Sequence, residues 1–213
     1  MLRSGRMDGS AREKLERDVR ELCQRGDHSA AATIALKSYG PEIFGFLVTM
    51  HGSEADASDA FAEVSEALWR SLPAFGWECS LRTWAYAITR NLLRAQRRGA
   101  ARRRRRGVPV GDSALEDIVQ GVRTETLTFL RTETRTRLQE LRGTLPEEDR
   151  MLLVLRIDKK LPWNDLARVL AERDGDGPLS GAELAREAAR LRKQFQLVKD
   201  RLRALAKAEG LLG

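Results

Sequence analysis

The chain has 213 residues, a formal net charge of +7 at pH 7 and an isoelectric point near 9.9, and its length suits one domain or two small ones. The basic balance favours a polyanionic partner, and the two cysteines and two histidines show neither zinc-ligand spacing nor a disulfide framework. Residues 1–30 are charged throughout and no long apolar run follows, so we expect no signal peptide, no membrane span and a cytoplasmic protein.

Helical periodicity dominates the first half of the chain, and no useful stretch alternates apolar and polar residues. We therefore predict an all-α fold. After an N-terminal extension with a short charged helix, apolar spacing predicts a helix over residues 28–50 that breaks or restarts at Gly40 and Pro41. Ser53 predicts the N-cap of the next helix, whose outer face is acidic. That face is either solvated or suited to a basic protein partner.

Aromatic and cationic side chains gather in residues 69–98, which hold three of the four tryptophans. Residues 79–111 contain ten arginines and no acidic residue. Unpaired bases stack on aromatic rings and arginines neutralise phosphates, so this composition favours single-stranded nucleic acid. Ser80 predicts the N-cap of an amphipathic helix, and the loop before it carries Phe75 and Trp77. The alternative is that the rings belong to the core and the arginines to a solvated face.

The composition changes at residues 99–124, where an arginine-rich, Gly/Pro-punctuated stretch predicts a flexible linker. Its run Arg102–Arg106 is either an exposed tether or a nonspecific phosphate contact. Further helices are predicted from Pro146, from Pro162 and from about Gly181. Two helices, a turn and a helix with exposed Arg, Lys and Gln side chains are typical of a helix-turn-helix reader of the major groove. A three-helix bundle that ends in a coiled coil fits the same spacing.

Three stretches resemble, in order, regions of the bacterial RNA polymerase sigma factors of the extracytoplasmic-function (ECF) group. The family's second region is similar to DASDAFAEVSEALWRSLPAF with SLRTWAYAITRNLLRAQRR. The family's fourth region is similar to LPEEDRMLLVLRIDKKLPWNDLARVL. The recognition helix that ends this region is similar to AARLRKQFQLVKDRLRAL. The resemblance covers residues 35–98 and 138–205. It implies a subunit that binds core polymerase, recognises two promoter elements and melts the downstream one.

The expected organisation is two small helical domains joined by a flexible basic linker. It comprises an N-terminal extension (1–30), a domain like sigma region 2 (31–98), the linker (99–124) and a helix-turn-helix domain like sigma region 4 (125–213). The resemblance implies core RNA polymerase, through its β′ clamp helices and β flap, and promoter DNA as partners, with an anti-sigma factor as a candidate third. It implies no enzyme activity, no catalytic residue, no cofactor and no metal.

The resemblance also assigns roles to residues by position. The helix that docks on the β′ clamp helices corresponds to Asp56, Asp59, Glu63 and Trp69. The loop and helix that contact the minus-ten element correspond to Phe75, Trp77, Ser80, Arg82, Thr83, Trp84, Tyr86, Arg90 and Asn91. The surface that reads the minus-thirty-five duplex corresponds to Arg186, Arg190, Arg192, Lys193 and Gln194.

The chain departs from the family pattern in a few places. Ala62 stands where the family commonly has glutamine, Ala87 where a basic residue is usual, and Ala95 where an acid is frequent. The turn over residues 171–184 is about ten residues longer than an ordinary helix-turn-helix connection. Two other classes stay open: a helix-turn-helix regulator that acts without polymerase, and an RNA-binding or nucleoid protein that uses the arginines without promoter preference.

Overall fold

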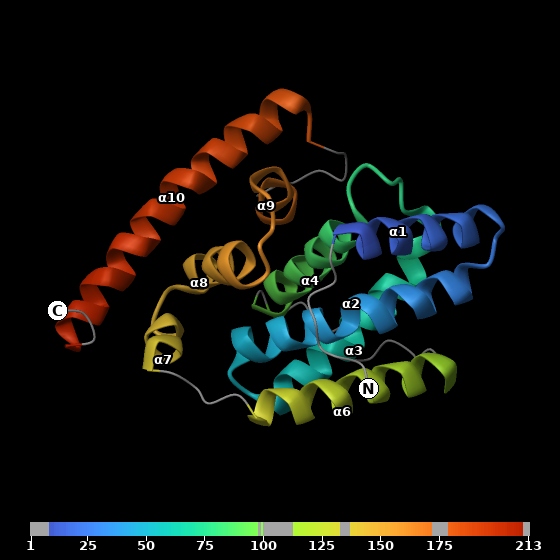
Figure 1. The fold of residues 1–213 in the computed structure, drawn as a ribbon, viewed down its shortest axis with the longest axis horizontal. Coiled ribbons are helices and arrows are strands. Elements are labelled where there is room, and N and C mark those ends of the chain that lie inside the picture. The colour runs from blue at the N-terminus through green and yellow to red at the C-terminus, as the bar shows by residue number, and fades with distance from the viewer. Residues whose placement is uncertain (1–8, 98, 100–112, 133–136, 172–178, 211–213) are drawn as a thin grey trace. The chain divides into compact units, whose positions relative to one another are not determined.

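The computed structural model describes residues 9–97, 99, 113–132, 137–171 and 179–210 (Figure 1). Within these ranges every regular element is a helix and no strand occurs, which confirms the predicted all-α class. None of the helices described is both long and apolar enough to cross a bilayer. The chain divides into two compact units, residues 1–132 and 133–213.

The first unit is built around one central helix, α2, which packs against α1, α3, α4 and α6. Helix α3 in turn packs against α4 and α6. The elements of this unit are α1 (Gly9–Gln24), α2 (His28–His51), α3 (Glu54–Ser71), the 3-10 turn η1 (Leu72–Ala74), α4 (Leu81–Arg97) and α6 (Ser113–Thr132). Large apolar side chains of α2, α3 and α4 form its core, among them Phe44, Phe46, Phe61 and Tyr86.

Helix α2 runs unbroken through Gly40 and Pro41, so the predicted break is wrong. A proline inside a helix costs a backbone hydrogen bond. Here the helix buries residues on both sides of it, including Leu36 and Phe44, and this packing outweighs the local cost. Its end is marked by Gly52, whose φ of 70° suits glycine.

Helix α6 crosses an expected domain boundary. Its residues 113–132 span the end of the expected linker (99–124) and the start of the expected second domain (125–213). Leu115, Val119 and Val122 of α6 are buried, and the helix packs on α2 and α3. The approach is close: a Cβ added at Gly40 would lie 3.1 Å from Val122 Cγ1. The first unit therefore extends to residue 132. The run Arg102–Arg106 lies outside the described residues.

The second unit consists of short helices packed on one long helix. Its elements are α7 (Arg137–Gly143), α8 (Glu147–Leu153), the π-helical turn η2 (Val154–Asp158), α9 (Trp163–Leu170) and α10 (Gly181–Ala208). Leu145, Leu153 and Val198 form a buried cluster between α8 and α10. Ser180 and Glu183 form a capping box at the start of α10. The helix starts predicted at Pro146, Pro162 and Gly181 are confirmed within one residue.

Candidate nucleic-acid interface

A stack of three aromatic rings connects the loop over residues 75–80 to helix α4. The ring centroid of Phe75 lies 4.7 Å from that of Trp77 and 4.5 Å from that of Trp84. Phe75 is buried, whereas the two tryptophans are half-buried. Trp77 has a φ of 57°, a left-handed conformation that a bulky side chain rarely adopts. The loop and the first turn of α4 therefore each place an indole ring against a buried phenylalanine.

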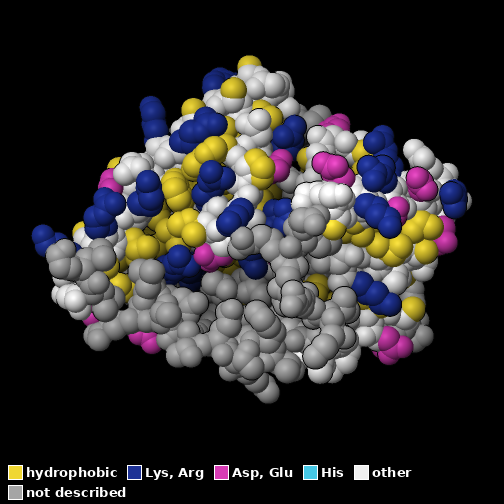
Figure 2. Space-filling view, viewed as in Figure 1, with side chains coloured by type: hydrophobic (Ala, Val, Ile, Leu, Met, Phe, Trp, Pro, Cys, Tyr) yellow, Lys and Arg dark blue, Asp and Glu magenta, His cyan; other side chains and the backbone are white. Residues whose placement is uncertain are grey.

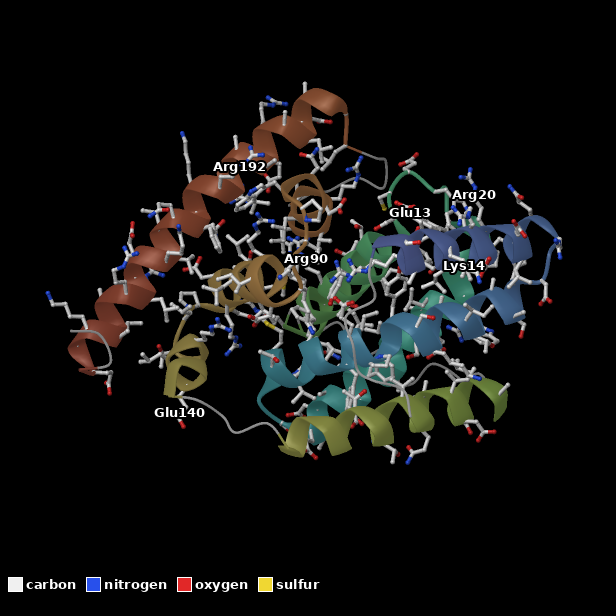
Figure 3. All side chains as sticks on the ribbon, in the orientation of Figure 1. Glu13, Lys14, Arg20, Arg90, Glu140 and Arg192 are labelled. Carbon is white, nitrogen blue, oxygen red and sulfur yellow. The ribbon has the colours of Figure 1, made fainter. Side chains whose placement is uncertain are left out.

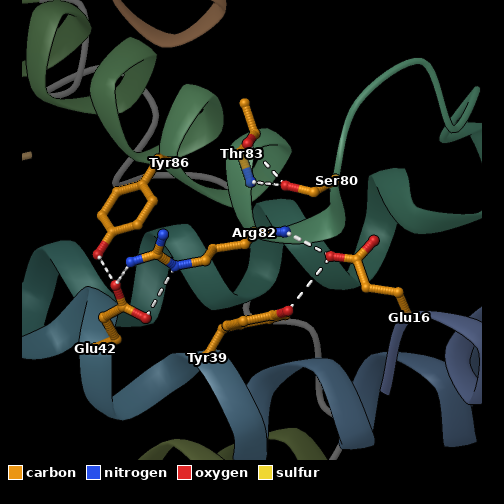
Figure 4. A network of polar contacts seen from close by, with 7 residues as sticks. All are labelled: Glu16, Tyr39, Glu42, Ser80, Arg82, Thr83 and Tyr86. Carbon is orange, nitrogen blue, oxygen red and sulfur yellow. Dashed lines mark hydrogen bonds and ion pairs between the residues drawn. The ribbon is translucent and has the colours of Figure 1, made fainter. Parts of the chain in front are cut away.

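The first turn of α4 is capped twice. Ser80 Oγ accepts a hydrogen bond from the Thr83 amide at 3.0 Å, which confirms the predicted cap. Glu16 of α1 supplies the second cap, because its carboxylate accepts a hydrogen bond from the Leu81 amide at 2.9 Å. It also accepts one from the Arg82 amide at 3.5 Å (Figure 4). A carboxylate is also favourable at the positive end of a helix dipole. The end of the aromatic loop is thus fixed to α1.

Glu42 of α2 organises a second polar cluster beneath α4. Arg82 Nε donates to Glu42 Oε2 at 3.1 Å, Arg82 Nη2 donates to Glu42 Oε1, and the Tyr86 hydroxyl donates to Oε1 at 2.9 Å (Figure 4). Burial and the charge of Glu42 raise the pKa of Tyr86. Burial opposes the charge on Arg82, but the hydrogen bond and charge of Glu42 outweigh it and raise the pKa of the guanidinium.

The residues expected to contact the minus-ten element therefore fall into two groups. Arg82, Thr83, Tyr86 and Arg90 are at most 7% exposed, and in this conformation their side chains belong to the interior. The part of the set that reaches the surface consists of Trp77, Ser80, Trp84 and Asn91, with Phe75 beneath the rings. Spacing along α4 does not separate these groups, because Arg82 and Tyr86 find their polar partner, Glu42, on α2.

The residues expected to dock on polymerase all lie on α3. Asp56 and Asp59 are exposed, and Glu63 is half-exposed and accepts a hydrogen bond from Gln96 Nε2 at 3.4 Å. Helical spacing places these three carboxylates on one face. Trp69 is half-buried and falls about a quarter turn or more away from them on the same spacing. The acidic face is therefore formed by three of the four predicted residues.

The predicted duplex-reading residues lie on α10 in the second unit, where Figure 2 shows Lys and Arg side chains along the helix. Gln194 Nε2 donates to Asp149 Oδ1 at 2.9 Å, so it joins α10 to α8. Arg190 donates to Glu187 at 2.6 Å and to Gln194 Oε1 at 3.2 Å. Arg192 lies over the ring of Trp163, with Cζ 5.5 Å from the centroid.

The two remaining members of this set, Arg186 and Lys193, are exposed. Neither makes a hydrogen bond or ion pair with the part of the chain that is described. Their seven-residue separation places them two turns apart on one face of α10. In the same described ranges, no group of three or more His, Cys, Asp or Glu side chains could hold a metal ion.

Comparison with known proteins places this geometry in a family. The sigma-70 region 2 family matches residues 35–105, which include α3, α4 and most of α2. The RNA polymerase sigma-H factor of Pseudomonas aeruginosa is 30% identical to the chain over 168 residues, which cover 74% of this chain and 83% of that protein. The aromatic loop and the acidic face both lie within the matched region. The chain belongs to the RNA polymerase sigma factor family.

Proposed function

We propose that the chain is an ECF-type sigma factor that binds core RNA polymerase, directs it to specific promoters and helps to melt the minus-ten element. The observation that carries this proposal is the aromatic stack at the start of α4, in which buried Phe75 contacts the half-buried rings of Trp77 and Trp84. It lies inside the region that matches the sigma factor family. A protein that bound only duplex DNA would have no use for indole rings held in this way, because paired bases are stacked on one another.

The stack provides a physical route to strand opening. Extruding a base from the duplex costs a few kcal/mol of unstacking and unpairing. Stacking of that base on an aromatic side chain returns about 1–3 kcal/mol. Trp77 and Trp84 are the half-buried rings that would receive the base, and buried Phe75 supports both. The left-handed backbone of Trp77 is typical of a functional position, because such conformations persist where the surrounding structure imposes them.

The remaining roles follow from exposure. Ser80 and Asn91 are the polar residues of the expected minus-ten set that reach the surface beside the rings. The acidic face of α3, formed by Asp56, Asp59 and Glu63, would meet a basic docking surface such as the β′ clamp helices. The second unit would contact the β flap and read the minus-thirty-five duplex with α10. An anti-sigma factor is a further candidate partner, and the mechanism uses no cofactor and no covalent chemistry.

Replacing Trp77 by alanine tests the melting role. We expect the variant to bind core polymerase and to form the closed complex on paired promoter DNA as the parent does. We expect opening to weaken by about 1–3 kcal/mol, because the extruded base loses its stacking partner. Permanganate reactivity of thymines in the minus-ten region measures the opening. A matched variant, Trp77→Phe, keeps a ring and should retain most of the reactivity. Equal opening by the parent and the alanine variant would refute the role of Trp77.

Replacing Arg186 and Lys193 by alanine, singly, tests the role of α10. A contact to a base edge costs about 1–3 kcal/mol and relaxes preference at one position. A contact to a phosphate weakens all sequences alike and lowers the salt slope by about one. Binding of the holoenzyme to promoter duplexes over a salt series measures both. Lys207→Ala, in the last turn of the same helix, is the control that should change neither. Unchanged binding by both variants would contradict the proposal that this face of α10 contacts the minus-thirty-five duplex.

Binding to the same promoter duplexes distinguishes the proposed sigma factor from the alternative function, a helix-turn-helix regulator. A helix-turn-helix regulator that acts without polymerase would bind them tightly as the isolated chain. The proposed sigma factor should bind them with promoter preference only in the presence of core polymerase. Co-purification of the chain with core polymerase decides between these two functions most directly.

A further inference from the structure

Helix α1 contributes two side chains to the surroundings of the aromatic loop, although it lies outside the matched residues 35–105. The helix is anchored in the first unit, because it packs on α2 and its Val19 is fully buried. Glu16 and Arg20 are four residues apart and therefore share one face of α1. That face lies against the loop: Glu16 caps α4 and Arg20 lies beside Trp77.

The contact between Arg20 and Trp77 is a cation–π interaction. The Cζ atom of Arg20 lies 5.5 Å from the centroid of the Trp77 ring, within the range in which a guanidinium is attracted to an aromatic face. Tryptophan gives the strongest such interaction among the aromatic residues. Arg20 is exposed, so the contact costs little desolvation of the cation. Glu16, one turn earlier, accepts a hydrogen bond from the first amide of α4 at 2.9 Å and so holds this part of α1 against α4.

The Trp77 ring needs support from outside its own loop. Its backbone is in a left-handed conformation that bulky residues disfavour, and the neighbouring Gly76 gives the loop additional backbone freedom. The ring contacts Phe75 on its own loop and Arg20 on α1. Without Arg20, the indole would keep Phe75 as its aromatic neighbour among the described residues, together with a disfavoured backbone angle. The contact from α1 therefore restricts the orientations of the ring that receives the base.

We propose that Arg20 is a positioning residue for base capture, which makes the N-terminal helix a working part of the promoter-opening site. The proposal rests on the proposed function of Trp77. Arg20 acts through the ring and does not need to touch the DNA. Tyr39 reinforces the arrangement, since its hydroxyl donates to Glu16 Oε1 at 3.3 Å (Figure 4). Burial and the charge of Glu16 raise the pKa of that hydroxyl.

The test compares two single-stranded oligonucleotides bound to the reconstituted holoenzyme. One carries the non-template minus-ten sequence of a promoter that the holoenzyme opens, and the other has an abasic site at the captured position. Arg20→Ala should bind the intact oligonucleotide about two- to fivefold more weakly, the equivalent of one exposed cation–π contact. It should bind the abasic oligonucleotide as the parent does. Arg20→Lys, which keeps a cation over the ring, should retain most of the affinity.

Two variants make the result specific. Lys14→Ala removes one positive charge from the same helix (Figure 3), and its spacing from Arg20 places it on a different face. Lys14→Ala should weaken the binding of either oligonucleotide by no more than the loss of one distant positive charge does. Trp77→Ala should lose the difference between the two oligonucleotides. Circular dichroism should show the parent's helical content in every variant.

Three results would overturn the inference. An equal loss on both oligonucleotides with a smaller salt slope would make Arg20 a phosphate contact. Tighter binding by Arg20→Ala would mean that the guanidinium competes with the base for the ring. Unchanged binding by Arg20→Ala, with Trp77→Ala still impaired, would leave the proposed function standing without this role. If Trp77→Ala itself distinguishes the oligonucleotides as the parent does, base capture by Trp77 fails instead.

Discussion

Replacing Glu42 by alanine should lower the free energy of unfolding of the first unit by about 3–5 kcal/mol. Breaking a fully buried ion pair on one side costs this much because the other charge stays out of water, and the 23% exposure of the Glu42 side chain places the expected cost at the lower end of this range. Arg82 is 7% exposed and donates twice to Glu42, and Tyr86, which is 1% exposed, loses the same acceptor for its hydroxyl. Urea unfolding followed by circular dichroism measures the change.

A surface pair in the same unit provides the control. Arg70 and Glu66 form an ion pair at 2.6 Å, but their side chains are 58% and 34% exposed. Glu66→Ala should therefore cost no more than about 1 kcal/mol. Replacing both members of the Arg82–Glu42 pair, by Glu42→Leu with Arg82→Met, should recover much of the loss, because apolar residues of similar volume often replace a buried pair at little cost. If Glu42→Ala costs no more than Glu66→Ala, Glu42 does not stabilise the position of α4.

Reversing the charge of Asp59 and Glu63 together should abolish association with core polymerase. Both carboxylates lie on the outer face of α3, and like charges brought together across an interface cost several kcal/mol. We therefore expect a loss of at least about a hundredfold in affinity. The isolated double variant, Asp59→Lys with Glu63→Lys, should keep its helical content. Co-purification with core polymerase measures the association.

The matched control reverses two acids elsewhere on the same unit. Glu116 and Asp117 are exposed near the start of α6, so Glu116→Lys with Asp117→Lys changes the net charge equally. This variant should associate with polymerase as the parent does. Loss of association in both variants would reflect net charge alone, and retention in both would show that polymerase docks elsewhere.

Local patterns in the sequence predicted the elements well, because caps and apolar spacing act within a few residues. The caps at Ser53 and Ser80 are both seen as hydrogen bonds to the amide three residues later. The long helix α10 begins where its turn chemistry predicts. The break at Pro41 failed as a prediction because burial on both sides of it, a tertiary effect, outweighs the local cost of proline.

The candidate site was predicted less completely, because its supports are distant in the sequence. Glu16 lies 65 residues before the amide of Leu81 that it caps, and Glu42 lies 40 residues before Arg82. No local signal distinguishes these glutamates from other acidic residues on exposed helices. Spacing could place Arg82 and Asn91 on the same helix, but only the packing of α2 against α4 buries the first and leaves the second exposed.

The position of α6 in the first unit changes which parts of the chain the arginine-rich segment before it connects. Because α4 and α6 both belong to the first unit, the sequence between them joins two helices of one unit and does not join the two units. The five arginines Arg102–Arg106 belong to that intervening sequence. Nonspecific attraction to DNA would then belong to the unit that carries the aromatic stack.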